Sequence, residues 1–155
     1  MQVAATRPTY EQERGKPMPS KNHGLVQYFL GLAFSRYSDR FTVIPELSLE
    51  LGGPPLVPDL SVYPKLPIDW LHDEIKMTDP PLTVVEILSP TQGTDELIRK
   101  ADEYFKGGVK CFWIVQPSLK VVAVLEPGKE VRTYSSGEVE DPATGMSVAL
   151  EEIFP

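Results

Sequence analysis

The stretch from residue 82 to residue 115 constrains the fold of this chain more than any other. Leu82–Leu88 is a nearly continuous apolar run, which is typical of a strand buried on both faces of a sheet. A helix is predicted to begin near Thr94 and to end before Gly107-Gly108. Val109–Val115 is a second apolar run. Strand, helix and strand in this order predict a β-α-β unit with a right-handed crossover, and therefore an α/β domain.

Further segments complete a mixed central sheet flanked by helices. From His23 to about Tyr37, apolar residues recur at spacings of three and four, which predicts an amphipathic helix that Ser20 or Asn22 can cap. Short apolar or alternating segments predict the other strands, the first three as a meander, and a helical turn ends the chain. These segments are Phe41–Ile44, Leu47–Leu51, Leu56–Tyr63, Leu119–Leu125 and Glu130–Tyr134, with the turn at Leu150–Phe154. The helices are expected on both faces of the sheet or together on one face.

The length of 155 residues suits one domain with one core. Residues 1–20 are predicted to form an extended or irregular arm, because Pro8, Pro17 and Pro19 exclude a continuous helix, and residues 21–155 to form the domain. The arm is too polar for a signal peptide, and no apolar run reaches the ~18 residues of a membrane span. Cys111, the only cysteine, lies in an apolar run and is expected to be a reduced core residue of a cytoplasmic protein.

The formal net charge is −7, from 22 acidic and 15 basic residues. This balance argues against broad nonspecific affinity for nucleic acid, which requires a basic footprint. It does not exclude a nuclease, because metal sites concentrate acidic side chains whose charge bound cations offset. Lys65, Lys76 and basic residues near the second helix could also form a local phosphate-binding patch.

Glu86 is the residue that points most directly to a chemical function. It lies in the middle of the central apolar run, and strand alternation places it on one face with Val84 and Leu88. An ionised carboxylate in such a place is costly unless it is paired or bound to a metal. A structural salt bridge and a metal-binding role both meet this requirement.

Two further residues suggest that Glu86 belongs to a site. Asp59 interrupts another apolar strand, so two carboxylates could converge on a cation such as Mg²⁺, although an Asp after a proline also commonly starts a turn. Lys100 lies at the edge of the apolar stripe of the second helix and could direct its ammonium group toward Glu86 or remain at the surface. That stripe comprises Leu97, Ile98, Ala101, Tyr104 and Phe105. Acids, a divalent ion and a lysine suit phosphodiester hydrolysis, but also metal binding without catalysis.

The segments around these residues resemble a known nuclease family. In chain order they are Val57–Tyr63, Leu82–Pro90, Lys100 with Tyr104-Phe105 and Gly108-Val109, and Trp113–Pro117. Together they resemble the Uma-type putative restriction endonuclease family of the PD-(D/E)XK nuclease superfamily. Gly15–Ser20 with His23 is similar to the N-terminal pattern of that family, so the resemblance covers roughly Tyr10 to Glu126.

This resemblance implies a restriction-endonuclease-like fold, an endonuclease that acts on DNA, and Mg²⁺ or Mn²⁺ as cofactor. Asp59 and Glu86 take the roles of the two motif acids that hold the metal, and Lys100 takes the role of the lysine, because Leu88 stands at the usual lysine position of the superfamily. Glu46 matches another acid of the family and is a third ligand or a strand-end charge. His23 is a proton shuttle, a phosphate contact or a structural hydrogen-bonding residue.

Partners and alternative functions follow from size and charge. A chain of this length has little surface to surround duplex DNA, so a homodimer that acts on two strands is expected. One alternative is a non-catalytic nucleic-acid-binding or regulatory protein on a degenerate nuclease fold, which the acidic charge favours. Another is a nuclease for a different nucleic acid. Trp70, in the long loop at 64–81, could stack on substrate or anchor its loop, whereas Trp113 is expected in the core.

Overall fold

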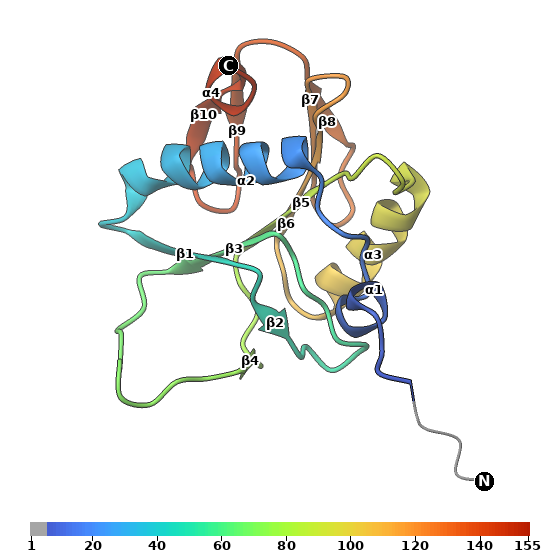
Figure 1. Cartoon of the computed structure of the whole chain (residues 1–155). Coiled ribbons are helices and arrows are strands. Elements are labelled where there is room, and N and C mark those ends of the chain that lie inside the picture. Colours follow the sequence, from blue (N-terminus) through green and yellow to red (C-terminus); the bar gives the residue numbers. More distant parts are fainter. Residues whose placement is uncertain (1–5) are drawn as a thin grey trace, which may run out of the picture.

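A six-stranded mixed sheet forms the centre of the computed structural model, which describes residues 6–155 (Figure 1). The strand order is β1-β3-β5-β6-β7-β8, and all neighbours are antiparallel except the central parallel pair β5 and β6. The strands are β1 (Phe41–Pro45), β3 (Leu60–Pro64), β5 (Thr83–Ile87), β6 (Cys111–Gln116), β7 (Val121–Leu125) and β8 (Arg132–Tyr134). The predicted mixed central sheet is confirmed.

The predicted β-α-β unit is confirmed at the centre of this sheet. All five residues of β5 are buried, and α3 (Thr94–Lys106) connects β5 to its parallel neighbour β6. Because side chains alternate along a strand, β5 serves two cores. Val84 belongs to the core beneath α3, whereas Val85 and Ile87 belong to the core on the opposite face. Glu86 therefore projects toward α3, where Lys100 meets it.

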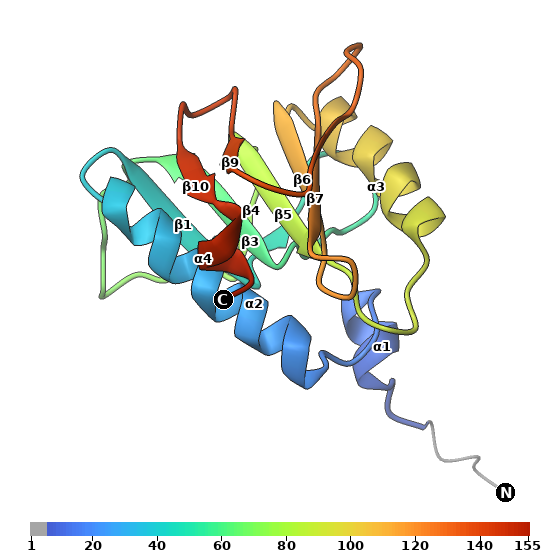
Figure 2. The same ribbon diagram turned by 90° about the horizontal axis from the view of Figure 1, so that it is seen from above.

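Helices cover both faces of the sheet, as the views from two directions show (Figures 1 and 2). On one face lies α2 (Lys21–Phe34), which the side chain of Ser20 caps as predicted and which continues into a 3-10 turn, η1 (Ser35–Tyr37). The ring of Phe34 meets Trp113 edge to face, with centroids 5.5 Å apart. A hairpin and a short helix pack on this same face: β9 (Glu138–Glu140), β10 (Ser147–Ala149) and α4 (Leu150–Ile153). No helix within residues 6–155 has the length and apolarity required to cross a bilayer.

The N-terminal segment differs from the extended or irregular arm that its prolines suggested. Residues 10–14 form a short helix, α1 (Tyr10–Arg14), which fits between Pro8 and Pro17. Thr9 and Gln12 form a capping box at its start, and Gly15 ends it at a φ of 67°. The prolines exclude a continuous helix but not a short capped one. The chain then turns back onto the domain, which buries Lys16.

The region between β1 and β3 corrects the predicted meander. β1 pairs directly with β3, whereas β2 (Ser48–Leu49) leaves the sheet and pairs in parallel with β4 (Lys76–Met77). Leu56 makes only an isolated bridge to Leu49, so β3 begins just after Asp59 instead of at Leu56. The physical reason is the proline content of the segment, since each proline lacks a backbone donor and restricts the residue before it.

Two helix positions also differ from the expected apolar stripes. Leu25 in α2 is 45 % exposed, and Ile98 in α3 is 49 % exposed. Their neighbours Val26 and Leu97 face the core instead. A helical stripe predicted from spacing alone was therefore one residue too wide at each of these points.

Candidate active site

Asp59 is a buried carboxylate held by three different parts of the chain. Its Oδ1 accepts a hydrogen bond from Lys16 Nζ at 2.8 Å and lies 3.1 Å from His23 Nε2. Its Oδ2 accepts a hydrogen bond from the backbone N–H of Ile87 at 2.6 Å. Burial opposes ionisation, but the hydrogen bond from His23 and the charge of Lys16 outweigh it, so the pKa of Asp59 lies below its ordinary value. Asp59 is therefore ionised at neutral pH.

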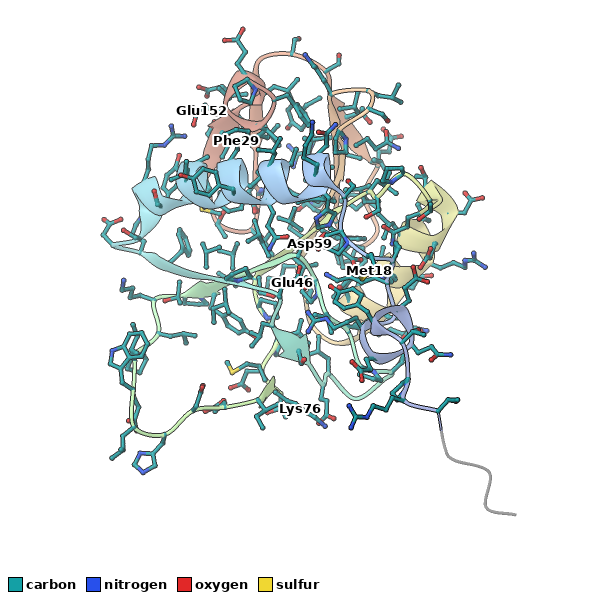
Figure 3. The ribbon with its side chains drawn as sticks, in the orientation of Figure 1. Met18, Phe29, Glu46, Asp59, Lys76 and Glu152 are labelled. Atoms are coloured by element: carbon teal, nitrogen blue, oxygen red, sulfur yellow. The ribbon has the colours of Figure 1, made fainter. Side chains whose placement is uncertain are left out.

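Lys16 bridges Asp59 to a second carboxylate, Glu46. The Nζ atom of Lys16 lies 2.9 Å from Glu46 Oε2, and the Lys16 side chain is only 7 % exposed. Burial lowers the pKa of Lys16, but the attraction of Asp59 and Glu46 is stronger and raises it overall. Arg14 also pairs with Glu46, at 2.5 Å. Figure 3 shows Glu46 and Asp59 beside each other below α2, at the centre of the molecule.

Glu86 is paired through only one of its two oxygens. Lys100 Nζ lies 3.2 Å from Glu86 Oε1, whereas Oε2 is buried and has no hydrogen-bond partner in the described part of the chain. Burial raises the pKa of Glu86 to about 7, against the attraction of Lys100 and with the support of the nearby charge of Asp59. Glu86 is thus poised between its protonated and ionised forms, with one oxygen free to accept a proton or a cation.

Tyr104 shows that the three carboxylates gather in one region. Its hydroxyl group, on α3, is buried and has no partner among residues 6–155. Burial, followed by the charges of Glu86, Asp59 and Glu46, raises the pKa of Tyr104 well above its ordinary value. The phenol is therefore neutral and can donate one hydrogen bond into the site.

The structure brings together the five residues singled out from the sequence. Asp59 and Glu86 come from neighbouring parts of the sheet, Lys100 extends from the edge of the α3 stripe to Glu86, and His23 and Glu46 lie around Asp59. Leu88, at the usual lysine position of the superfamily, packs instead with the core beneath α3. The ring nitrogen of His23 that does not face Asp59, Nδ1, has no partner within the described chain.

Sequence reasoning did not single out Lys16, Arg14 or Tyr104 as site residues. Lys16 and Arg14 lie in a polar segment without periodicity, so no local pattern predicts their burial beside Asp59 and Glu46. The one available signal was the resemblance of Gly15–Ser20 to a family pattern. Tyr104 was predicted as a core residue of α3, which it is, and its free hydroxyl becomes visible only from the packing.

Other residues considered from the sequence lie outside this cluster. Lys65 donates to the carbonyl oxygen of Ser38, and Lys76 pairs with Glu50 at 2.6 Å, far below Asp59 in Figure 3. They do not form a phosphate-binding patch with the site. Trp70 is 89 % exposed, so it does not anchor its loop, whereas Trp113 is buried in the core as predicted.

The carboxylate oxygens of the site are the type of ligand atom that a hard divalent cation prefers. Mg²⁺ and Mn²⁺ prefer carboxylate oxygens, and the buried, unpaired Oε2 of Glu86 is such a donor. Asp59 is ionised and close enough for its charge to raise the pKa of Glu86. These two side chains are therefore the residues that would hold the ion. As arranged, their partners are protein cations, and no three His, Cys, Asp or Glu side chains of residues 6–155 form a ready-made metal-binding group.

One hollow adjoins the site, and a second lies beside the segments that carry Glu86 and His23. A cleft of about 880 Å³ lies between α2 and β1, with Arg14, His23 and Glu46 at its polar end and apolar residues such as Tyr28 and Phe41 elsewhere. A polar groove of about 490 Å³ lies where β5 and β6 end and where α2 and α3 begin. Its lining includes Ser20, Lys21, Asn22, Ser89, Gln92, Thr94, Gln116 and Ser118.

Comparisons with known proteins agree with this architecture. The model of the Uma2 family, described as putative restriction endonuclease, matches residues 11–155. The crystal structure of a putative nuclease belonging to DUF820 from Anabaena variabilis superimposes with a TM-score of 0.75 at 22 % identity, over 90 % of this chain and 83 % of that one, which shows a shared fold. A cryo-electron-microscopy structure of a DrdV–DNA complex reaches a TM-score of 0.39 at 16 % identity, over 71 % and 84 % of the two chains, too low to support an argument. No curated protein matches the chain.

Proposed function

The chain belongs to the Uma2 family, and on this premise we propose that it is a metal-dependent endonuclease that hydrolyses phosphodiester bonds of DNA. The observation that carries the proposal is Glu86. Glu86 is buried and leaves its Oε2 atom unpaired within residues 6–155. If this position had only a structural role, an apolar side chain would make the folded protein more stable than this carboxylate does. Its neighbours, an ionised carboxylate and a lysine, are those that phosphodiester hydrolysis requires.

Each residue has a role that its contacts support. Asp59 and Glu86 would hold a Mg²⁺ or Mn²⁺ ion, which when bound activates water and stabilises charge on the phosphate. The backbone N–H of Ile87 fixes the orientation of Asp59, and His23 holds the same carboxylate from α2. Lys100 donates one hydrogen bond to Glu86, and the other N–H groups of its ammonium could donate to a phosphate oxygen or position the attacking water. Glu46 anchors Arg14 and Lys16 at the edge of the site.

The polar groove beside the site suits a phosphate backbone. The N-termini of α2 and α3 meet there, and unpaired backbone N–H groups at helix N-termini favour anions. Lys21 adds a positive charge to the same groove. Its lining includes Leu88, two residues beyond Glu86, and Asn22, which directly precedes His23. A DNA strand bound in this groove would therefore pass beside the segments that carry Glu86 and His23, although neither side chain lines the groove itself.

We further propose that the protein acts as a homodimer in the cytoplasm. A loop with four large, strongly exposed apolar side chains carries the dimer proposal: Ile68, Trp70, Leu71 and Ile75. The same loop carries the acids Asp69, Asp73 and Glu74, which argues against contact with DNA and favours a protein surface. The apolar end of the cleft between α2 and β1 offers such a surface on a second copy. The buried thiol of Cys111 supports a reducing compartment.

The second candidate function is nucleic-acid binding or regulation without catalysis. One observation favours it: Lys16 already pairs with Asp59. A degenerate nuclease in which a lysine permanently replaces the metal would show this pair. The two functions differ in whether the acids and Lys100 are required for cleavage.

Plasmid cleavage in the presence of Mn²⁺ tests the proposal. We expect Asp59→Asn, Glu86→Gln and Lys100→Met each to lower the cleavage rate by about 100-fold or more, as loss of a charge-stabilising or metal-holding group does. Glu50→Gln and Lys76→Met are matched controls, because this exposed pair removes the same charges far from the site. Cleavage that survives Glu86→Gln would overturn the proposal. Binding of DNA by all variants, with no cleavage by the wild type, would establish the second function.

A further inference from the structure

The ammonium group of Lys16 lies beside Asp59, where a metal ion bound in this site would also lie. Its Nζ lies 2.8 Å from Asp59 Oδ1 and 2.9 Å from Glu46 Oε2, and its side chain is 7 % exposed. The ammonium group is thus a buried positive charge between two carboxylates. It belongs to the segment between α1 and α2, whereas both of its partners lie more than 25 residues further along the chain.

The hydrogen bonds of Asp59 leave little room for a second cation. Oδ2 is engaged by the backbone N–H of Ile87, and Oδ1 faces both Lys16 and His23. An ammonium group and a divalent ion at one oxygen repel each other at such short range. The backbone N–H of Ile87 cannot move away from Asp59 Oδ2 without disturbing β5. Lys16 is the partner that can move, because a flexible four-carbon stem carries its charge.

We propose that Lys16 is a tethered cation that competes with the divalent metal for Asp59, so that metal binding transfers its ammonium group to Glu46 alone. The inference rests on the proposed function, because it requires a metal at Asp59 and Glu86. Glu46 is suited to retain the displaced group. It already contacts Lys16 and Arg14, and its side chain is 33 % exposed at the rim of the cleft. In the metal-free protein Lys16 bridges the two acids and neutralises Asp59.

Titration of Mn²⁺ into the metal-free protein tests this competition by calorimetry. Lys16→Met removes the charge and keeps most of the side-chain volume, so it should bind Mn²⁺ about tenfold more tightly than the wild type, a gain of about 1.4 kcal/mol. In the Asp59→Asn background the same substitution should bring no gain. Lys76→Met, which removes an exposed lysine, should leave the affinity unchanged.

Acetylation of lysines in the wild type, followed by mass spectrometry, needs no variant. Lys16 should react slowly in the metal-free protein, since it is buried, and faster once Mn²⁺ is saturating. The reactivity of exposed Lys76 should not change. This measurement tests the displacement of the ammonium group even if Lys16→Met folds poorly.

The outcomes separate this inference from the proposed function. If Asp59→Asn abolishes Mn²⁺ binding but Lys16→Met binds no more tightly than the wild type, or if Lys16 stays protected in saturating Mn²⁺, the competition is overturned and the metal site stands. If neither Asp59→Asn nor Glu86→Gln affects Mn²⁺ binding, the metal site itself fails and this inference fails with it. Tighter binding by Lys16→Met that depends on Asp59 supports both.

Discussion

Replacement of Glu86 by glutamine tests how strongly burial opposes the ionisation of the Glu86 side chain. Burial raises the pKa of Glu86 to about 7 from an ordinary value of 4.5. Between these values the folded protein keeps a proton that the unfolded chain has released. The stability that this proton contributes is therefore fully present below about pH 4.5 and is lost as the pH rises through about 7.

The expected magnitude follows from the two pKa values. Their difference, 7 minus 4.5, multiplied by about 1.4 kcal/mol for each pH unit, gives between about 3 and 4 kcal/mol. Glutamine cannot ionise, and its differences in packing and hydrogen bonding do not depend on pH. The free energy of unfolding of Glu86→Gln, minus that of the wild type, should therefore rise by about 3 kcal/mol between about pH 4 and pH 8.

Urea unfolding followed by tryptophan fluorescence measures this difference, with a chelator present, at several pH values from about 4 to 8. Asp59→Asn is a control of opposite sign. The pKa of Asp59 is lowered, so its contribution is present above the ordinary value of 3.8 and is lost as the pH falls further. The variant should thus lose more stability at neutral pH than at about pH 3. A Glu86→Gln difference that stays constant from about pH 4 to pH 8 would refute the reasoning.

Three further predictions concern the fold. Gly107→Ala should lower the free energy of unfolding by about 1–3 kcal/mol, because its Cβ would lie 2.5 Å from Cβ of Leu51, whereas Gly93→Ala, with open space around it, should be nearly neutral in urea unfolding. Leu30→Ala should cost about 2–5 kcal/mol in the same assay, since Leu30 is fully buried in the core on the inner face of α2, and an unchanged midpoint would contradict this packing. Burial raises the pKa of the Cys111 thiol, so a thiol-specific reagent should react with it only after unfolding, and rapid reaction in the native protein would refute its burial.

The central part of the fold was predictable because its signals are local. A strand buried on both faces needs an apolar run, and a helix that crosses over it needs a periodic stripe with a stop at its end, so β5, α3 and β6 follow from adjacent residues. The position of Lys100 at the edge of that stripe left open whether its ammonium group reaches Glu86 or stays at the surface, and the packing of α3 on the sheet decided for Glu86. The hairpin of β9 and β10 was missed, because strands of three residues carry too little pattern.

The surroundings of the two acids depended on contacts between distant parts of the chain. From its apolar strand alone, Glu86 could be identified as a carboxylate that needs a partner. Only the tertiary structure decided that Asp59 is already engaged by Lys16, His23 and the backbone of Ile87. Lys16 and His23 come from the N-terminal part of the chain and Ile87 from β5, all far from Asp59 in sequence, and no local periodicity specifies which of them will meet. The sequence determined which carboxylates stand in apolar segments and need partners, and the packing of α1, α2 and β5 decided which charges face them.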